Sequence, residues 1–227
     1  MISNQLAVLL STLTLLGTVA LLVVAAAMAG WAALRGNRPL LRKAGAGAAG
    51  LVGGYAMILL GAGLVSRDAV QAADGEKYFC EIDCHLAYRV VSLRPAKEVP
   101  GATGQVWAVE LRTRFDETTI SARRGREAPL WPSPRHVALR DSAGGTHEPM
   151  AGSEEWLVRQ EIRSTPLSQE LRPGDAYTTT LLFDLRPGAP PAQLLVEDAG
   201  WPGVLLIGGE QSPWHGKVLL PLPAEAP

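Results

Sequence analysis

The chain has 227 residues, a formal net charge of −1, 47% hydrophobic residues and 19% charged residues. This near-neutral charge argues against a general nucleic-acid-binding protein. The charges are unevenly placed, because residues 1–34 carry none and every acidic residue lies after position 66. The sequence therefore joins a membrane segment to a water-soluble segment, which excludes a purely cytosolic enzyme.

Two uncharged, apolar runs lie at the N-terminus, over residues 6–34 and 44–66. A helix needs about 20 apolar residues to cross about 30 Å of hydrocarbon, so both runs predict transmembrane helices. The small residues at 25–30 also fit a cleaved signal peptide. However, no Lys or Arg precedes the first run, which is far longer than the usual stretch of about 7–15 residues. We therefore expect a retained helical hairpin over residues 1–66.

The segment between the two runs, residues 35–43, has four basic side chains and no acidic one. The positive-inside rule places such a loop in the cytoplasm. Both termini are then outside the cytoplasm. We expect a bacterial inner (cytoplasmic) membrane protein with a short linker at 67–77 and a periplasmic domain at 78–227.

The second apolar run is rich in glycine. Four of its glycines are spaced three, four and seven residues apart and share one helix face: Gly47, Gly50, Gly54 and Gly61. Small residues on one face let another helix approach closely within lipid. This face could pack against the first helix of the same chain or against a helix of another subunit, and both alternatives stay open at this point.

From Tyr78 onward the apolar residues alternate with polar ones, which is typical of half-buried strands. Turn residues at 141–145 and 173–175 separate such segments. One short helix is expected after Ser153, with Trp156 and Ile162 on its buried side. Strands are expected at 82–90, 107–115, 137–139, 177–185, 193–196, 203–207 and 217–222. Seven or eight short strands in about 145 residues predict an antiparallel β-sandwich.

Two segments carry a family resemblance. The first is the run 107–115 together with 136–149 and its Gly-Gly turn, and the second is the run 171–185 with its Pro-Gly-Asp turn. They resemble the immunoglobulin-like domains of uncharacterised bacterial lipoproteins and membrane-anchored proteins, over roughly residues 100–200. The resemblance implies an immunoglobulin-like sandwich outside the cytoplasm and an adhesive or accessory role. It implies no chemistry.

The two cysteines, Cys80 and Cys84, lie just after the expected linker and are followed by His85. Two cysteines in an extracytoplasmic domain suggest a disulfide first. In a straight strand, residues four apart are about 13 Å apart, whereas a disulfide needs Cα atoms within about 7 Å. A disulfide or a shared metal ion therefore requires a tight loop before a strand that starts at about Cys84.

Other uses of this cluster compete with the disulfide. The spacing resembles a lengthened c-type haem attachment motif, and also the thiol pairs of Sco-type copper chaperones and of oxidase subunit II. Thiolates and imidazole suit copper or zinc, and His215 is a further candidate ligand. The remaining histidines, His136 and His147, flank the 141–145 turn and are expected to be surface residues.

The sequence contains no Gly-x-Ser-x-Gly elbow, no His-Glu-x-x-His motif and no phosphate-binding glycine loop. We therefore expect a non-enzymatic accessory or scaffolding subunit of a larger membrane complex, without a cofactor; a respiratory or photosynthetic complex is one kind of host. The glycine face would contact integral membrane subunits, and the sandwich would contact extracytoplasmic proteins. The alternative is an electron-transfer or metal-delivery protein that binds copper or haem through the cysteine cluster.

Overall fold

The computed structural model describes residues 2–81, 84–125, 127–199 and 203–223, with side chains from residue 9 onward. The chain forms two compact units. The first contains the two N-terminal helices and the segment 203–216, and the second contains the β-strands.

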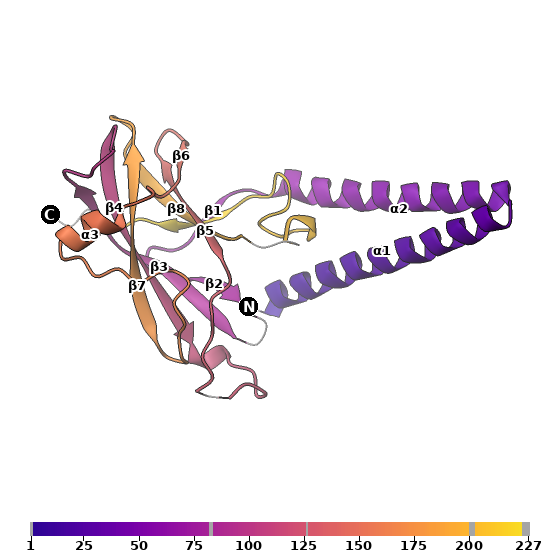
Figure 1. Cartoon of the computed structure of the whole chain (residues 1–227), viewed down its shortest axis with the longest axis horizontal. Coiled ribbons are helices and arrows are strands. Elements are labelled where there is room, and N and C mark those ends of the chain that lie inside the picture. Colours follow the sequence, from indigo (N-terminus) through magenta and orange to yellow (C-terminus); the bar gives the residue numbers. More distant parts are fainter. Residues whose placement is uncertain (1, 82–83, 126, 200–202, 224–227) are drawn as a thin grey trace. The chain divides into compact units, whose positions relative to one another are not determined.

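Two long helices, α1 (Ile2–Leu34) and α2 (Arg38–Val65), form a hairpin (Figure 1). The connection is only three residues long. Gly36 adopts a φ of 65°, a left-handed conformation that glycine takes without steric cost. The Asn37 side chain then caps α2 by accepting a hydrogen bond from the Leu40 amide at 3.1 Å. These local signals close the hairpin tightly.

The expected cytoplasmic loop at 35–43 is therefore shorter in the structure. Arg38, Arg42 and Lys43 lie in the first turns of α2, because the cap at Asn37 starts the helix before them. Their basic charge stays at the closed end of the hairpin.

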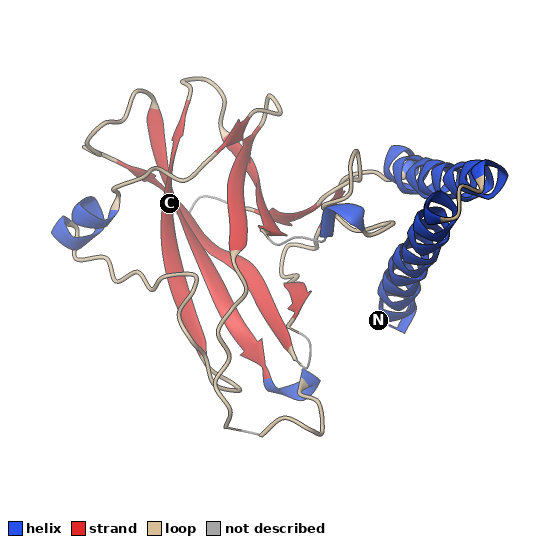
Figure 2. Ribbon diagram, turned by 45° about the vertical axis from the view of Figure 1, so that its right-hand side comes forward, coloured by secondary structure: helices blue, strands red, loops and turns tan. Residues whose placement is uncertain are grey.

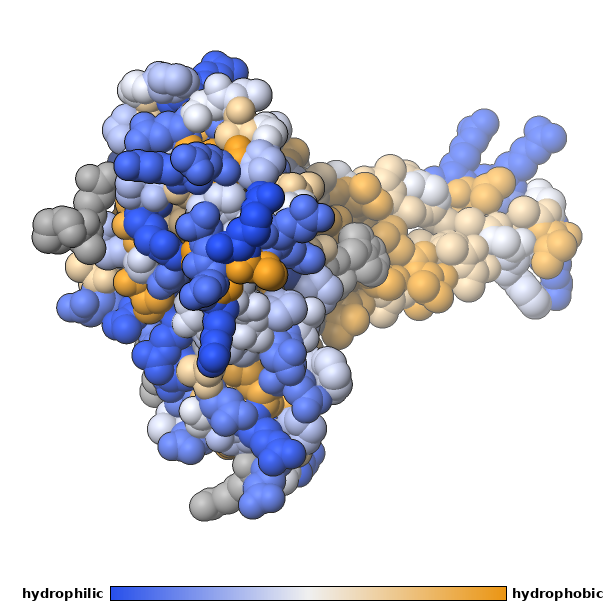
Figure 3. Space-filling view, turned by 60° about the vertical axis from the view of Figure 1, so that its left-hand side comes forward, coloured by the Kyte–Doolittle hydropathy of each residue, from blue (hydrophilic) through white to orange (hydrophobic). Residues whose placement is uncertain are grey.

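Both helices are long and apolar enough to cross a membrane, over Leu9–Leu34 and Arg38–Val65. On the face shown in Figure 3, hydrophobic residues dominate the surface of the helices, whereas hydrophilic residues cover most of the β-domain. The two helices thus indicate membrane anchoring.

The less exposed residues of each helix recur at spacings of three and four, as in packed helix pairs. On α1 they are Ser11, Thr12, Leu15, Thr18, Leu22, Ala25, Ala29 and Ala32, and on α2 as far as Tyr55 they are Leu40, Ala44, Ala48, Leu51, Gly54 and Tyr55. Alanine and serine supply much of this seam.

The β-domain is a two-sheet sandwich (Figure 2). Its strands are β1 (Ala69–Val70), β2 (Lys77–Cys80), β3 (His85–Ala96), β4 (Gln105–Asp116), β5 (Arg135–Asp141), β6 (Thr146–His147), β7 (Ala176–Leu185), β8 (Pro191–Asp198) and β9 (Val218–Pro221). One sheet has the order β1-β9-β8-β5-β6 and the other has the order β2-β3-β4-β7.

The predicted sandwich is confirmed. Two details differ: β1 pairs with β9 in parallel, and β1 lies inside the predicted linker 67–77.

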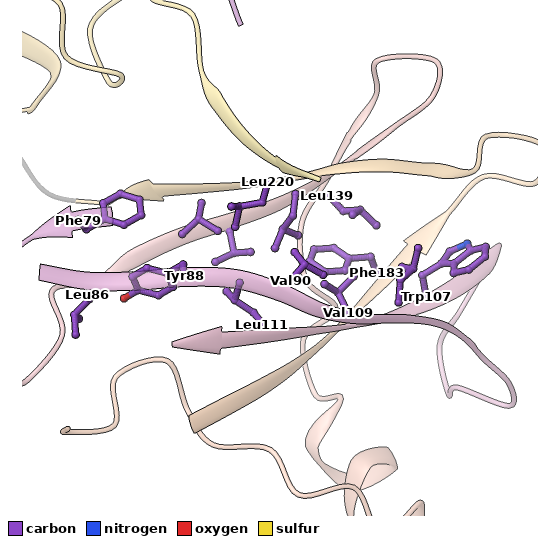
Figure 4. Packing of buried hydrophobic residues seen from close by; sticks show 14 of the residues in the cluster. Phe79, Leu86, Tyr88, Val90, Trp107, Val109, Leu111, Leu139, Phe183 and Leu220 are labelled. Carbon is purple, nitrogen blue, oxygen red and sulfur yellow. The ribbon is translucent and has the colours of Figure 1, made fainter. Parts of the chain in front are cut away.

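The main core lies between the two sheets (Figure 4). Alternate residues of β3 and β4 point into it, including Leu86, Tyr88, Val109 and Leu111, all with no exposed surface. The facing sheet contributes a second set, namely Val137, Leu139, Leu194, Val196 and Leu220. The period-two pattern of the sequence thus marks the inward faces of both sheets.

A short helix, α3 (Glu154–Arg159), covers part of the outer face of the four-stranded sheet. Its Trp156 and Leu157 pack with Val106, Ala108 and Leu182. This second contact explains why residues 106–109 of β4 are all buried, on both faces of the strand. Ser153 precedes α3 as predicted, although its side chain makes no capping hydrogen bond.

The outer edge of β7 is paired with a long irregular segment instead of being open. The Met150 amide donates to the Leu182 carbonyl at 2.7 Å, and the Thr165 amide donates to the Thr178 carbonyl at 3.0 Å. Covering an edge in this way prevents another strand from adding to the sheet.

Candidate functional site

The cysteine cluster lies in the β2–β3 hairpin. Cys80 is paired with His85, and the Glu81 amide donates to the Cys84 carbonyl at 2.8 Å. The expected tight loop and the start of the next strand after Cys84 are therefore present. Residues 82 and 83 lie outside the described part of the chain.

The hairpin register separates the two thiols. Residues paired across the hairpin share one face, so Cys80 lies on the face of His85 and Cys84 on the face of Glu81. Cys80 is exposed, whereas Cys84 is 1% exposed and faces the core. The two cysteines are not joined to each other in the structure. The disulfide that the sequence favours is thus not formed here, and bringing the thiols together would require one residue to leave its face.

The four proposed metal ligands do not form one site either. Cys84 packs in the main core, and His215 Nδ1 is 2.7 Å from the Gly216 carbonyl oxygen. Within the described ranges, no three His, Cys, Asp or Glu side chains are grouped as metal ligands would be.

Different burial predicts different reactivity of the two thiols. In the native, unreduced protein, a maleimide should label Cys80 and leave Cys84 unlabelled until the domain is unfolded, which intact-mass spectrometry would show as one and then two additions. In Cys80→Ser, the native protein should take no label and the unfolded protein one. A protein that takes no label even when unfolded without reductant would show a disulfide and contradict this assignment.

A buried ionic cluster lies beside this hairpin, and the sequence pattern gave no indication of it. Arg135 has a side chain only 1% exposed and forms ion pairs with Glu81 and Asp198. Its guanidinium also lies over two aromatic rings, 4.4 Å from the centre of Phe79 and 5.7 Å from that of Tyr88. We call Arg135, Glu81 and Asp198 the Arg135 cluster.

Besides its ion pair with Arg135, Glu81 is hydrogen-bonded to a neighbouring serine. Its carboxylate accepts hydrogen bonds from the Ser133 hydroxyl at 2.6 Å and from the Ser133 amide at 3.3 Å. Burial raises the pKa of the neighbouring Tyr88 hydroxyl above its ordinary value, so this tyrosine stays protonated at any physiological pH. The Arg135 cluster therefore pairs one buried guanidinium with two carboxylates of the same domain, which suits a structural role.

Lys77 is a second buried cation, 4% exposed, and it joins the two sheets. From β2 its Nζ donates to the carbonyl oxygens of Val196 on β8 and Val218 on β9, at 2.7 and 2.8 Å. These bonds fix β2 across the end of the opposite sheet.

The two histidines beside the 141–145 turn have local partners. His136 Nε2 is 3.0 Å from Glu148 Oε1, and His147 Nε2 is 2.8 Å from Asp141 Oδ2. The His147 contact and the turn amides hold the pKa of the Asp141 carboxyl below its usual value. Both imidazoles therefore support the hairpin that carries them.

A small depression next to α3 is lined by Val99, Pro100, Met150, Trp156 and Arg159, among others. Its volume of ≈ 50 Å³ is comparable to one or two water molecules. Ligand pockets of drug size are about 300–1,000 Å³, so this depression does not resemble one.

The glycine face of α2 is open in the structure. A Cβ atom built on Gly47, Gly50, Gly54 or Gly61 would meet no other atom within 4 Å. None of these four glycines is in close contact with α1, although Gly54 and Gly61 are half-buried. The alanine-rich seam described above accounts for the contact between the helices instead.

No protein-family model and no curated protein matches the chain. Two solved structures are similar to it, each at 13% sequence identity. MPT63, a secreted protein from Mycobacterium tuberculosis, aligns with 68% of this chain and 97% of its own at a TM-score of 0.44. A conserved hypothetical protein from Bacillus anthracis aligns with 56% of this chain and 87% of its own at a TM-score of 0.31.

Proposed function

We propose that this protein is a non-enzymatic accessory subunit, anchored by α1 and α2 in a larger complex of the bacterial inner membrane. The observation that carries the proposal is the open glycine face of α2. Because α1 packs elsewhere on α2, this face is free to receive a helix of another integral membrane subunit.

The proposed topology follows the basic residues at the closed end of the hairpin. Arg35, Arg38, Arg42 and Lys43 would lie in the cytoplasm, and the β-domain would lie in the periplasm. The sandwich, with its proposed immunoglobulin-like character, would contact extracytoplasmic partners. Its buried cations, Arg135 and Lys77, both bind groups of the same domain, which supports a scaffolding role over a catalytic one.

The test is native electrophoresis of membranes solubilised in mild detergents. The wild-type protein should migrate with larger partners, and the pair Gly50→Leu with Gly54→Leu should shift it to a free form, because leucine blocks close helix approach. A matched control is Gly45→Leu with Ala49→Leu, which enlarges two exposed residues of α2 off the glycine face. This control should leave the large species unchanged.

Two results would contradict the proposal. One is a wild-type protein that migrates as a lone monomer in every mild detergent. The other is equal loss of the large species in both pairs of substitutions, which would point to a general effect on α2.

A further inference from the structure

The segment 203–216, which we call the β8–β9 loop, connects two strands of the sandwich but belongs to the helical unit. It starts with a single 3₁₀ turn, η2 (Gly203–Leu205), and it lies along the C-terminal part of α2 (Figure 1). The strand predicted at 203–207 is not formed, because these residues adopt a 3₁₀ turn and further turns. The apolar residues there are not in a sheet.

Three contacts fix the β8–β9 loop on α2. The Tyr55 hydroxyl donates a hydrogen bond to the Leu205 carbonyl. At Gly63 a Cβ atom would lie 2.1 Å from the Pro213 carbonyl oxygen, so only glycine allows this approach. Further along, Ser66 Oγ is 3.4 Å from His215 Nδ1. The start of the loop therefore lies beside the middle of α2, and its end lies beside the end of α2.

The membrane depth of these contacts follows from the helix geometry. The last charged residue near the start of α2 is Lys43. A hydrocarbon layer of about 30 Å corresponds to about 20 helical residues, which puts the far boundary close to Gly63. Tyr55 is then about 12 Å inside that boundary, at about 1.5 Å per residue. A loop carbonyl bonded to Tyr55 lies at the same depth.

The loop residues become more polar from the membrane interior toward its boundary. Its start, residues 204–207, reads Val-Leu-Leu-Ile, and Val204 is 42% exposed. Polar residues begin at Glu210, nearer the boundary. Trp214, 66% exposed, lies next to the residue that contacts Ser66, at the level where tryptophan is enriched in membrane proteins.

Part of the loop backbone is hydrogen-bonded within the unit. Successive tight turns join Leu206 to Gly203, Gly209 to Leu206, Ser212 to Gly209, and His215 to Ser212, with N···O distances of 2.9–3.1 Å. Tyr55 satisfies the Leu205 carbonyl in addition. Each of these bonds lowers the cost of placing irregular backbone at membrane depth, because an unpaired polar group there is unfavourable.

We propose that the apolar start of the β8–β9 loop, residues 204–207, inserts into the lipid leaflet at the C-terminal end of α2. The ligand of this surface is the acyl-chain region of a bilayer, and the loop continues the lipid-facing surface of the helices. Trp214 lies at the level of the headgroups. This membrane contact requires no partner subunit, so it stands or falls separately from the accessory role.

The test uses the purified full-length protein in phosphatidylcholine vesicles. The native cysteines are first removed by Cys80→Ser and Cys84→Ser. An environment-sensitive fluorophore is then attached to a new cysteine, Val204→Cys. The control carries the same fluorophore at Ala143→Cys, in the exposed β5–β6 turn. The label at 204 should lose most of its fluorescence with lipids that bear a nitroxide on the acyl chain, and should resist aqueous iodide. The label at 143 should show the reverse. Iodide quenching at 204 equal to that at 143 would overturn the proposal.

A second pair of variants tests the role of α2. Gly63→Val should displace the loop, because its side chain would collide with the Pro213 carbonyl, and the label at 204 should lose its nitroxide quenching. Gly61→Val, two residues away with open space around it, should keep that quenching. Unchanged quenching in Gly63→Val would show that α2 does not hold the loop at this depth.

Discussion

Replacing Arg135 by methionine is expected to destabilise the β-domain by about 3–5 kcal/mol. Methionine keeps much of the side-chain volume over Phe79 and Tyr88 but removes the charge. Glu81, whose side chain is 6% exposed, would then be left as a buried carboxylate without its cation. Urea unfolding of the full-length protein in detergent, followed by far-ultraviolet circular dichroism, would measure the change in free energy of unfolding.

A surface ion pair provides the control for this prediction. Arg94 lies 3.4 Å from Glu110, and their side chains are 44% and 28% exposed. Arg94→Met should therefore cost less than about 1 kcal/mol. Adding Glu81→Gln to Arg135→Met should recover part of the lost stability, because it removes the unpaired charge. An Arg135→Met protein as stable as Arg94→Met would contradict the role assigned to the Arg135 cluster.

Truncating Phe183 to alanine is expected to cost a similar amount, about 3–5 kcal/mol. Phe183 has no exposed surface and lies in the main core opposite Trp107 in the β4–β7 ladder (Figure 4). The loss combines the transfer energy of the ring with the cavity that it leaves between two sheets. The same urea unfolding experiment would detect it as a lower denaturation midpoint.

Trp131 is the matched aromatic control, because it is 69% exposed in a loop of the same domain. Trp131→Ala should change the free energy of unfolding by no more than about 0.5 kcal/mol. Equal effects of the two substitutions would mean that the core around Phe183 does not determine the stability of the domain.

Much of the architecture could be predicted from the sequence because it depends on simple periodicities. The two helices follow from uncharged runs that are long enough to span a bilayer. The long strands follow from alternation, and β4 and β7 were placed within two residues of their observed ends. The tight turn between β2 and β3 is expected as the way to bring Cys80 and Cys84 together, and the turn is present although the two thiols lie on opposite faces.

Other features depend on tertiary contacts, which local patterns do not encode. The apolar residues 204–207 satisfy a strand pattern, but the contacts of the loop with Tyr55 and Gly63 place them on a helix. Cys80 and Cys84 lie on opposite faces because of the pairing register of the hairpin. A shift of that register by one residue would move one of the two cysteines to the other face. Arg135 resembles an ordinary surface arginine in the sequence, and only the approach of Glu81, more than fifty positions away, makes it a buried ion.

The assignment of the β8–β9 loop to the helical unit has a practical consequence for fragments of this protein. The chain passes between its two units at three places, so one proteolytic cut after α2 would not release a self-contained soluble domain. A recombinant fragment that begins at Ala69 would keep residues 203–216 while losing the helix that pairs with them. Its apolar residues 204–207 would then face water, and such a fragment is expected to aggregate unless that segment is shortened as well.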